Sequence, residues 1–303
     1  MAVHNPVHMN ESGLPLNAIE WLETHHRSKA PERARMIRDL QIRSGDFIVD
    51  AGCGPGLWTP LLARAIGSRG RIVGVDISPA ALVTAQHRLQ GKRYARQVQY
   101  KQGTLEELPV QLGSADMIFS ANVSQYLPDP VETFAAMGRY LGRGGRLAIK
   151  DIDFGTMRFS NIDPALQARV FQAREQWETR RVDEGYAFED SWVGSKLASY
   201  LRQAGYQDVE EKSYRITRRA PLPADFRFYL QGIAEWFVCE GAPYLDSIDV
   251  HRWQQLFQDG ECCVLDRHDF ASEEIEYVAT GVWPQSPAAQ VRYFDMCAAV
   301  PGV

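Results

Sequence analysis

The stretch from residue 47 to residue 59 constrains the fold most strongly, because it joins three local patterns without a break. An apolar run of strand type ends in the carboxylate Asp50, and apolar residues at helical spacing begin at Leu57. Between them lies a turn that contains Gly52, Gly54 and Gly56. Glycines allow a tight turn and let a ligand approach main-chain N–H groups that a Cβ would block. The stretch therefore predicts a strand, a turn and a helix that bind a nucleotide-like cofactor.

The spacing of the glycines separates two classes of cofactor. The dinucleotide fingerprint is G-x-G-x-x-G, whose third glycine allows close packing of helix against strand. Leu57 occupies that third position, and the extra glycine, Gly56, falls one residue earlier. A nicotinamide-dependent dehydrogenase is therefore a distant alternative.

A second predicted strand, residues 70–76, ends in Asp76. Ser78 and Pro79 then give the preferred start of a helix, an N-cap followed by proline at the first helical position. An acid about 20 residues after the glycine turn can accept hydrogen bonds from both hydroxyl groups of a ribose. The alternative for Asp76 is an ordinary capping acid.

The rest of the chain continues the alternation of strands and helices. Residues 98–109 predict a third strand and a polar loop. A fourth strand, a loop with a short helix, a further helix, a glycine turn and a fifth strand are expected at 116–121, 122–129, 130–141, 142–145 and 146–153. A later helix ends at Gly205 before a sixth strand, and a seventh strand is expected at 274–283. This order favours a parallel sheet with helices on both faces.

Together these segments resemble the class I S-adenosylmethionine-dependent methyltransferases, in particular the ubiquinone- and menaquinone-biosynthesis-like enzymes that act on small molecules. The resemblance rests on the acid and G-x-G-x-G turn at 50–56, on Asp76, and on the loops at 103–109 and 122–130. Thr104 stands where the family usually has an acid, which leaves its contact to the adenine open. The resemblance implies S-adenosyl-L-methionine as cofactor, held by Asp50, Ala51, Gly52, Gly54, Gly56, Thr59, Asp76, Ile77, Gly103, Thr104, Leu105, Asn122 and Tyr126.

The expected fold class is α/β, with a Rossmann-like, doubly wound sheet of seven mostly parallel strands in the order 3-2-1-4-5-7-6 and a helical cap. Residues 14–43 read as helical with a break near Pro31. The predicted parts are an N-terminal helical lid at 1–44, a cofactor-binding core at 45–153, a helical cap insertion at 154–189, continued core at 190–220, a second helical cap insertion at 221–270, and a final core strand and tail at 271–303.

Composition narrows the class of partner. The chain has 303 residues and a formal net charge of −5, which gives no general attraction to nucleic-acid phosphates. It holds five cysteines without metal-ligand spacing, so we expect reduced thiols and no metal site. No apolar run reaches the roughly 18 residues of a membrane span, and the N-terminus lacks a secretory signal. The expectation is a cytoplasmic monomer or homodimer with a small-molecule substrate.

Candidate catalytic residues are side chains that can take a proton from the methyl acceptor. They are His25, His26, Tyr126 and Asp151, with Glu235 as a further candidate. Residues 21–29 form either a lid over the active site or a solvated helix face. Asp151 and Asp153 are expected on one face at the carboxyl end of the fifth strand. The candidates for substrate contact in the cap are Trp21, Asp153, Tyr229 and Trp236, although most cap aromatics are expected to serve packing.

The predicted function is in-line transfer of a methyl group to an N, O or C nucleophile of a small, partly apolar metabolite, in secondary metabolism. One alternative keeps the cofactor site but performs a non-methylating reaction, such as cyclisation or decarboxylation. A second alternative is a cofactor-binding partner protein without turnover.

Overall fold

The computed structural model describes residues 19–183 and 189–284, and these residues fall into two compact units. Strands β5, β6 and β7 contribute residues to both units. Among the described residues, unit 1 comprises 19–35, 152–183, 189–192 and 214–276, and unit 2 comprises 36–151, 193–213 and 277–284.

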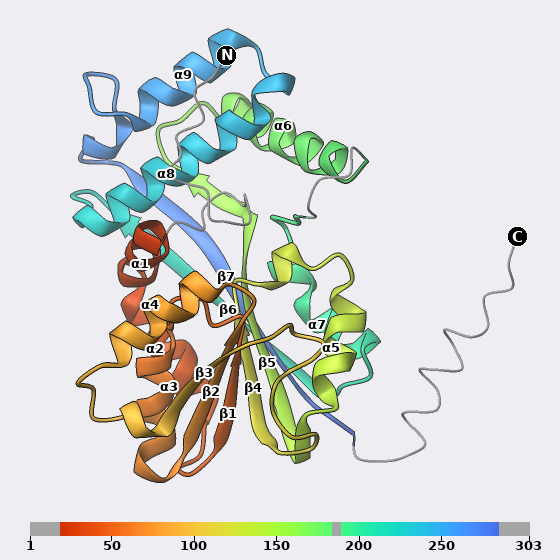
Figure 1. Ribbon diagram of the computed structural model, residues 1–303. Helices are drawn as coiled ribbons and strands as arrows, with labels where there is room; N and C mark the ends of the chain where they lie inside the picture. The colour runs from red at the N-terminus through yellow and green to blue at the C-terminus, as the bar shows by residue number, and fades with distance from the viewer. Residues whose placement is uncertain (1–18, 184–188, 285–303) are drawn as a thin grey trace, which may run out of the picture. The chain divides into compact units, whose positions relative to one another are not determined.

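A seven-stranded sheet has the order β3-β2-β1-β4-β5-β7-β6, which confirms the predicted topology (Figure 1). Strands β1 to β5 pair in parallel. At one end of the β5–β7 pair Ser160 N–H donates to the Ala271 carbonyl, and at the other Trp283 N–H donates to the Gly145 carbonyl. Since later residues of β7 pair with earlier residues of β5, β7 is antiparallel and the sheet is mixed. The strands are β1 (Phe47–Ala51), β2 (Arg71–Asp76), β3 (Val98–Gln102), β4 (Ala115–Ala121), β5 (Leu141–Phe159), β6 (Gln207–Arg219) and β7 (Ala271–Val282).

Helices cover both faces of the sheet within unit 2: α3 and α4 lie on one side, and α5 and α7 on the other (Figure 1). Ser78 caps α4 as predicted, because its hydroxyl accepts from the Ala81 N–H and Pro79 follows at the first helical position. The α-helices of the described residues are α1 (Ile19–Ser28), α2 (Ala30–Asp39), α3 (Thr59–Ile66), α4 (Pro79–Leu89), α5 (Pro130–Gly138), α6 (Pro164–Asp183), α7 (Leu197–Gln203), α8 (Ala224–Gly241) and α9 (Ser247–Phe257).

Three predicted boundaries are wrong: the end of the helix that begins at residue 130 and both ends of the fifth strand. The glycine turn predicted at 142–145 lies within β5. The helix expected at 130–141 ends at Gly138, and β5 begins at Leu141 because Ala115 N–H donates to the Tyr140 carbonyl and draws the chain into the sheet. The fifth strand does not end at 153 but continues to Phe159, so residues 154–159 are extended and not helical. Asp151 and Asp153 therefore lie within β5, not at its carboxyl end.

Each unit has its own apolar core. In unit 2 the core is built on β1, β2, β4 and β5. All five residues of β1, Phe47–Ala51, are buried. In unit 1, α8 packs against α1, α6 and α9, and aromatic side chains fill the space between them. The predicted break between the first two helices is present, since α1 ends at Ser28 and α2 begins at Ala30. The residues predicted helical at 14–18 lie outside the described part.

No helix among the described residues combines the length and the apolar character that crossing a membrane requires.

Gly138, the last residue of α5, provides a test of packing in unit 2. A Cβ at this position would overlap the indole ring of Trp283. Gly→Ala in a helix normally stabilises by about 1 kcal/mol. Here we expect Gly138→Ala to lower the free energy of unfolding by about 1–3 kcal/mol, because overpacking outweighs the gain in propensity. Urea unfolding measures the change. In a Trp283→Ala background, Gly138→Ala should lower the free energy of unfolding by less than it does in the wild type. Strict additivity of the two substitutions would contradict the clash.

Candidate functional site

The candidate cofactor site lies in unit 2, where the carboxyl ends of β1, β2 and β4 meet at one edge of the sheet. These strands are neighbours and parallel, with Ala51 in register with Val75 and Asp50 with Phe119. In open α/β sheets, ligands bind outside the carboxyl ends of the strands, where the strand order reverses. We call the segments 50–56, 76–78, 103–105 and 122–126 the cofactor cradle.

Asp76 joins the first two segments of the cradle. Its Oδ2 accepts from Gly54 N–H at 2.7 Å, and its Oδ1 accepts from Ser78 N–H at 2.9 Å. Burial raises the pKa of the Asp76 carboxyl, and the two amide donors act in the opposite direction. Each carboxylate oxygen has a second lone pair, so this half-buried group can still accept hydroxyl protons from a ligand.

Two glycines of the turn have different surroundings. Gly52 has a φ of +71°, and a Cβ there would overlap the side chain of Val123 from the 122–126 segment. Gly54 has a φ of +51°, and no heavy atom lies within 4 Å of the position that its Cβ would take. The backbone at Gly54 therefore faces open space, as the approach of a ligand to the main chain requires.

A buried polar chain lies beneath the turn. Tyr100 donates from its hydroxyl to Thr59 Oγ1 at 2.9 Å, and Thr59 Oγ1 lies 3.5 Å from Asp50 Oδ2. Burial, together with the negative charge of Asp76, raises the pKa of Asp50 to about 7. Because Asp50 and Asp76 repel each other, the site favours either a proton or a cationic ligand.

The remaining predicted cradle residues differ in their exposure. Gly103 N–H donates to the Asp76 carbonyl at 3.2 Å, which links the third loop to β2. Thr104 is exposed, and its Oγ1 accepts from Glu107 N–H at 3.1 Å. Ile77, directly after Asp76, leaves 61% of its surface exposed. A large apolar side chain beside a carboxylate suits an adenosine, whose base can cover the isoleucine while its ribose bonds the acid. Leu105 is half-buried, Ala51 and Gly56 are buried, and Tyr126 closes the 3-10 helix Ser124–Tyr126.

Sequence reasoning missed Lys150 and Tyr100. Lys150 is fully buried on β5, and its Nζ donates to Asn122 Oδ1 at 2.6 Å. A lysine inside the apolar run 147–152 was the signal available in the sequence. Its neighbour Asp151, a predicted catalytic residue, accepts from Ser124 N–H at 3.0 Å through Oδ2.

The other predicted catalytic and substrate residues belong to unit 1. There the His25 ring stacks on the Tyr229 ring, with 5.0 Å between the ring centroids, and its centroid lies 4.8 Å from that of the Trp21 ring. Two groups of opposite charge lie near His25 Nε2: Arg33 Nη2 at 3.2 Å and Glu276 Oε1 at 3.7 Å. Burial and the nearby charges of Lys29 and Arg33 hold the pKa of His25 well below its usual value, so the ring is neutral at pH 7.

These aromatic rings surround a buried ionic cluster. Lys29 Nζ lies 2.6 Å from Glu274 Oε1, 3.1 Å from Glu276 Oε1 and 4.2 Å from the centroid of the Tyr229 ring. Tyr229 in turn donates its hydroxyl to Glu274. Of the remaining predicted residues, His26 is half-buried on α1, Asp153 accepts from Gly155 N–H, and Trp236 packs against Phe154 at 5.0 Å.

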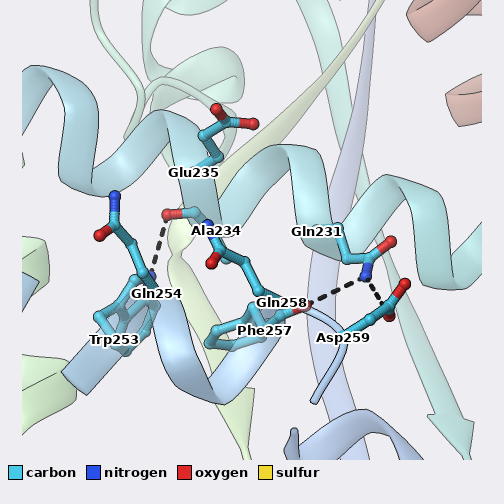
Figure 2. Close-up of a pocket in the computed structure, with 8 residues that line it drawn as sticks. All are labelled: Gln231, Ala234, Glu235, Trp253, Gln254, Phe257, Gln258 and Asp259. Carbon is cyan, nitrogen blue, oxygen red and sulfur yellow. Dashed lines mark hydrogen bonds between the residues drawn. The ribbon is translucent and has the colours of Figure 1, made fainter. Parts of the chain in front are cut away.

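A pocket of about 250 Å³ lies between α8 and α9 in unit 1, and Figure 2 shows its lining side chains. Gln231 donates from its amide to the Phe257 carbonyl and to Asp259 Oδ1, and Trp253 donates to the Ala234 carbonyl. Of the predicted catalytic candidates, Glu235 alone is among its lining residues. Much of the polar lining is therefore engaged in holding α8 to α9.

Comparison with known proteins identifies the family. A family model described as a methyltransferase domain matches residues 42–205, which is more than half of the chain. The chain belongs to this methyltransferase family. Its enzymatic activity is S-adenosyl-L-methionine-dependent methyl transfer, as the resemblance implied.

Individual relatives agree with the family. The methyltransferase is 25% identical over 193 residues to the demethylmenaquinone methyltransferase of Alkalihalophilus pseudofirmus, covering 62% of this chain and 81% of the relative. It is 35% identical over 134 residues to the trans-aconitate 2-methyltransferase of Azoarcus sp., covering 43% of this chain and 50% of the relative. The crystal structure of the YcgJ protein from Bacillus subtilis has the same fold, with a TM-score of 0.53 at 15% identity over 86% of this chain and 100% of that chain.

The raised pKa of Asp50 predicts how stability depends on pH. The unfolded carboxyl releases its proton near pH 4, whereas the folded one holds it to about pH 7, so rising pH between these values favours unfolding. Between pH 5 and 8 the cofactor-free protein should lose on the order of 2–4 kcal/mol relative to Asp50→Asn. Urea unfolding at several pH values measures this. The exposed control Glu107→Gln should parallel the wild type, and an Asp50→Asn curve that also parallels it would contradict the assignment.

Proposed function

We propose that this methyltransferase moves a methyl group from S-adenosylmethionine to an N, O or C nucleophile of a small, partly apolar metabolite by in-line displacement. The observation that carries the cofactor part is the arrangement at the end of β2, where a half-buried carboxylate stands next to an exposed isoleucine beside the open glycine turn. The acceptor class is supported by the relatives, whose names refer to demethylmenaquinone and trans-aconitate.

The residues fit the cofactor in shape and in charge. Asp76 would hold the ribose hydroxyls, Ile77 would cover the base, and the main chain at Gly54 would lie against the ligand. When bound, S-adenosylmethionine supplies a methyl group on a sulfonium, which carries a positive charge. The paired carboxylates Asp50 and Asp76 favour such a charge nearby.

What the protein adds to the reaction is mainly alignment and exclusion of water. A base is needed only if the acceptor must lose a proton as it attacks. His25, His26, Tyr126 and Asp151 remain the proposed candidates, with Trp21, Asp153, Tyr229 and Trp236 for substrate contact. For His25, burial and the charges of Lys29 and Arg33 lower the pKa well below its usual value, which keeps the ring unprotonated but weakens it as a base.

We also infer a cytoplasmic enzyme of secondary metabolism, a monomer or homodimer that does not act on nucleic acid. The net charge of −5 supports the last point, because binding to a phosphate backbone draws on Lys and Arg charge.

Asp76→Ala should weaken the binding of S-adenosylhomocysteine by about 1–3 kcal/mol, because the ribose loses its carboxylate acceptor. Isothermal titration measures the dissociation constant. Since Asp76 also accepts from Gly54 N–H and Ser78 N–H, Asp76→Asn is the milder companion, which keeps one acceptor oxygen. Unchanged affinity in both variants would remove Asp76 from the site.

Incubation with methyl-labelled S-adenosylmethionine and a panel of small quinols, phenols, carboxylates and amines tests the reaction itself. We expect label to move to at least one partly apolar acceptor. His25→Ala or His26→Ala should then lower turnover several-fold without changing the affinity for S-adenosylhomocysteine, because removing a base leaves cofactor binding intact.

Wild-type turnover in both histidine variants would assign residues 21–29 to a structural role. Cofactor binding without any transfer of label would favour the non-methylating alternative.

A further inference from the structure

Three hydrogen bonds join the start of the cradle segment 122–126 to two consecutive residues of β5. Asn122 N–H donates to the Lys150 carbonyl at 2.8 Å, and Lys150 Nζ donates to Asn122 Oδ1 at 2.6 Å. Ser124 N–H donates to Asp151 Oδ2 at 3.0 Å. Since Ala121 is in register with Lys150, these bonds begin where the β4–β5 ladder ends. They attach the loop to β5 beyond the last residue pair of the β4–β5 ladder.

Lys150 and Asp151 are fully buried in a strand that is otherwise apolar at this point. Burying a charged side chain is costly, and apolar residues of similar size would serve the sheet equally well or better. Both side chains bond to the 122–126 segment, so their burial is coupled to the position of that loop.

Asn122 adopts an unusual backbone conformation. Its φ is +58°, in the left-handed region, which asparagine adopts more readily than other residues besides glycine. Bonds from the surroundings can hold the backbone in this conformation. Lys150 supplies bonds to both the main chain and the side chain of Asn122, so it fixes this residue from two directions.

The conformation of Asn122 determines where the next residue lies. Val123 sits against Gly52, in the space that a Cβ at Gly52 would fill. A shift of Asn122 would move Val123 and so change the wall behind the glycine turn. A continuous chain of contacts thus runs from Lys150 through Asn122 and Val123 to Gly52.

We propose that Lys150 and Asp151 are positioning residues of the methyltransferase, which hold the 122–126 segment in the form that completes the cofactor cradle. This inference rests on the proposed location of the cofactor site. Lys150 acts through Asn122 and Val123, and Asp151 acts through the amide of Ser124.

The substitution Lys150→Met keeps the aliphatic length and removes the ammonium group. It should weaken S-adenosylhomocysteine binding, measured by isothermal titration well below the unfolding temperature, by about tenfold or more, since a hydrogen bond from a charged donor is lost. Lys92→Met, on the exposed turn after α4, is the matched control and should bind like the wild type. A merely structural lysine would lower the unfolding temperature of Lys150→Met without changing the affinity of the folded protein, and that result would overturn the proposal.

A double-mutant cycle tests the path through Asn122. Asn122→Gly tolerates the left-handed φ but removes the amide that Lys150 contacts. If Lys150 acts through this amide, Lys150→Met should weaken binding much less in the Asn122→Gly background than in the wild type. Fully additive effects on the dissociation constant would contradict the path.

Amide hydrogen exchange in the cofactor-free protein tests Asp151 independently of binding. Asp151→Asn keeps the shape but weakens the acceptor, so the Ser124 amide should exchange faster than in the wild type, while amides of β1 stay protected. Unchanged exchange at Ser124 would overturn this part. If the wild type itself fails to bind S-adenosylhomocysteine, the proposed function fails; if it binds and Lys150→Met binds equally well, the positioning role alone fails.

Discussion

The cradle depends on one carboxylate. Asp76 ends β2 and accepts from the amides of both Gly54 and Ser78, so it ties the glycine turn after β1 to the start of α4. Gly103 adds a third loop through the Asp76 carbonyl. The same group thus organises the protein backbone and keeps a free lone pair on each oxygen. The proposed contact to a ribose would use these lone pairs and would not compete with the amide bonds.

A second constraint is electrostatic. Asp50 lies buried near Asp76, and their repulsion adds to burial in raising the pKa of Asp50 to about 7. The cost of keeping two carboxylates close is offset when a positive charge arrives. This supports the proposal that a positively charged sulfonium binds near these two residues. Lys150, fully buried on β5, donates to Asn122 of the adjoining loop.

Much of the fold was predictable because local and long-range signals agree. The apolar run before Asp50, the Ser78-Pro79 helix start and the alternation of elements predict the strand order that the sheet has. The end of α5 and the length of β5 were not predictable, since they depend on pairing with Ala115 and on the antiparallel β7, which are distant in sequence. Lys150 was missed for a related reason. Its role depends on the loop that it contacts, and that loop is distant from it in sequence. The roles of the individual cradle residues, and of His25 and its neighbours in unit 1, stay predictions.

Amide hydrogen–deuterium exchange with and without S-adenosylhomocysteine tests the location of the cofactor site most directly, because it reports binding segment by segment without needing the acceptor. We expect slower exchange on binding in segments 50–56, 76–78, 103–105 and 122–126, with the strongest effect around Gly54 and Ser78, whose amides bond to Asp76. Protection confined to unit 1, or binding that leaves these four segments unchanged, would contradict it.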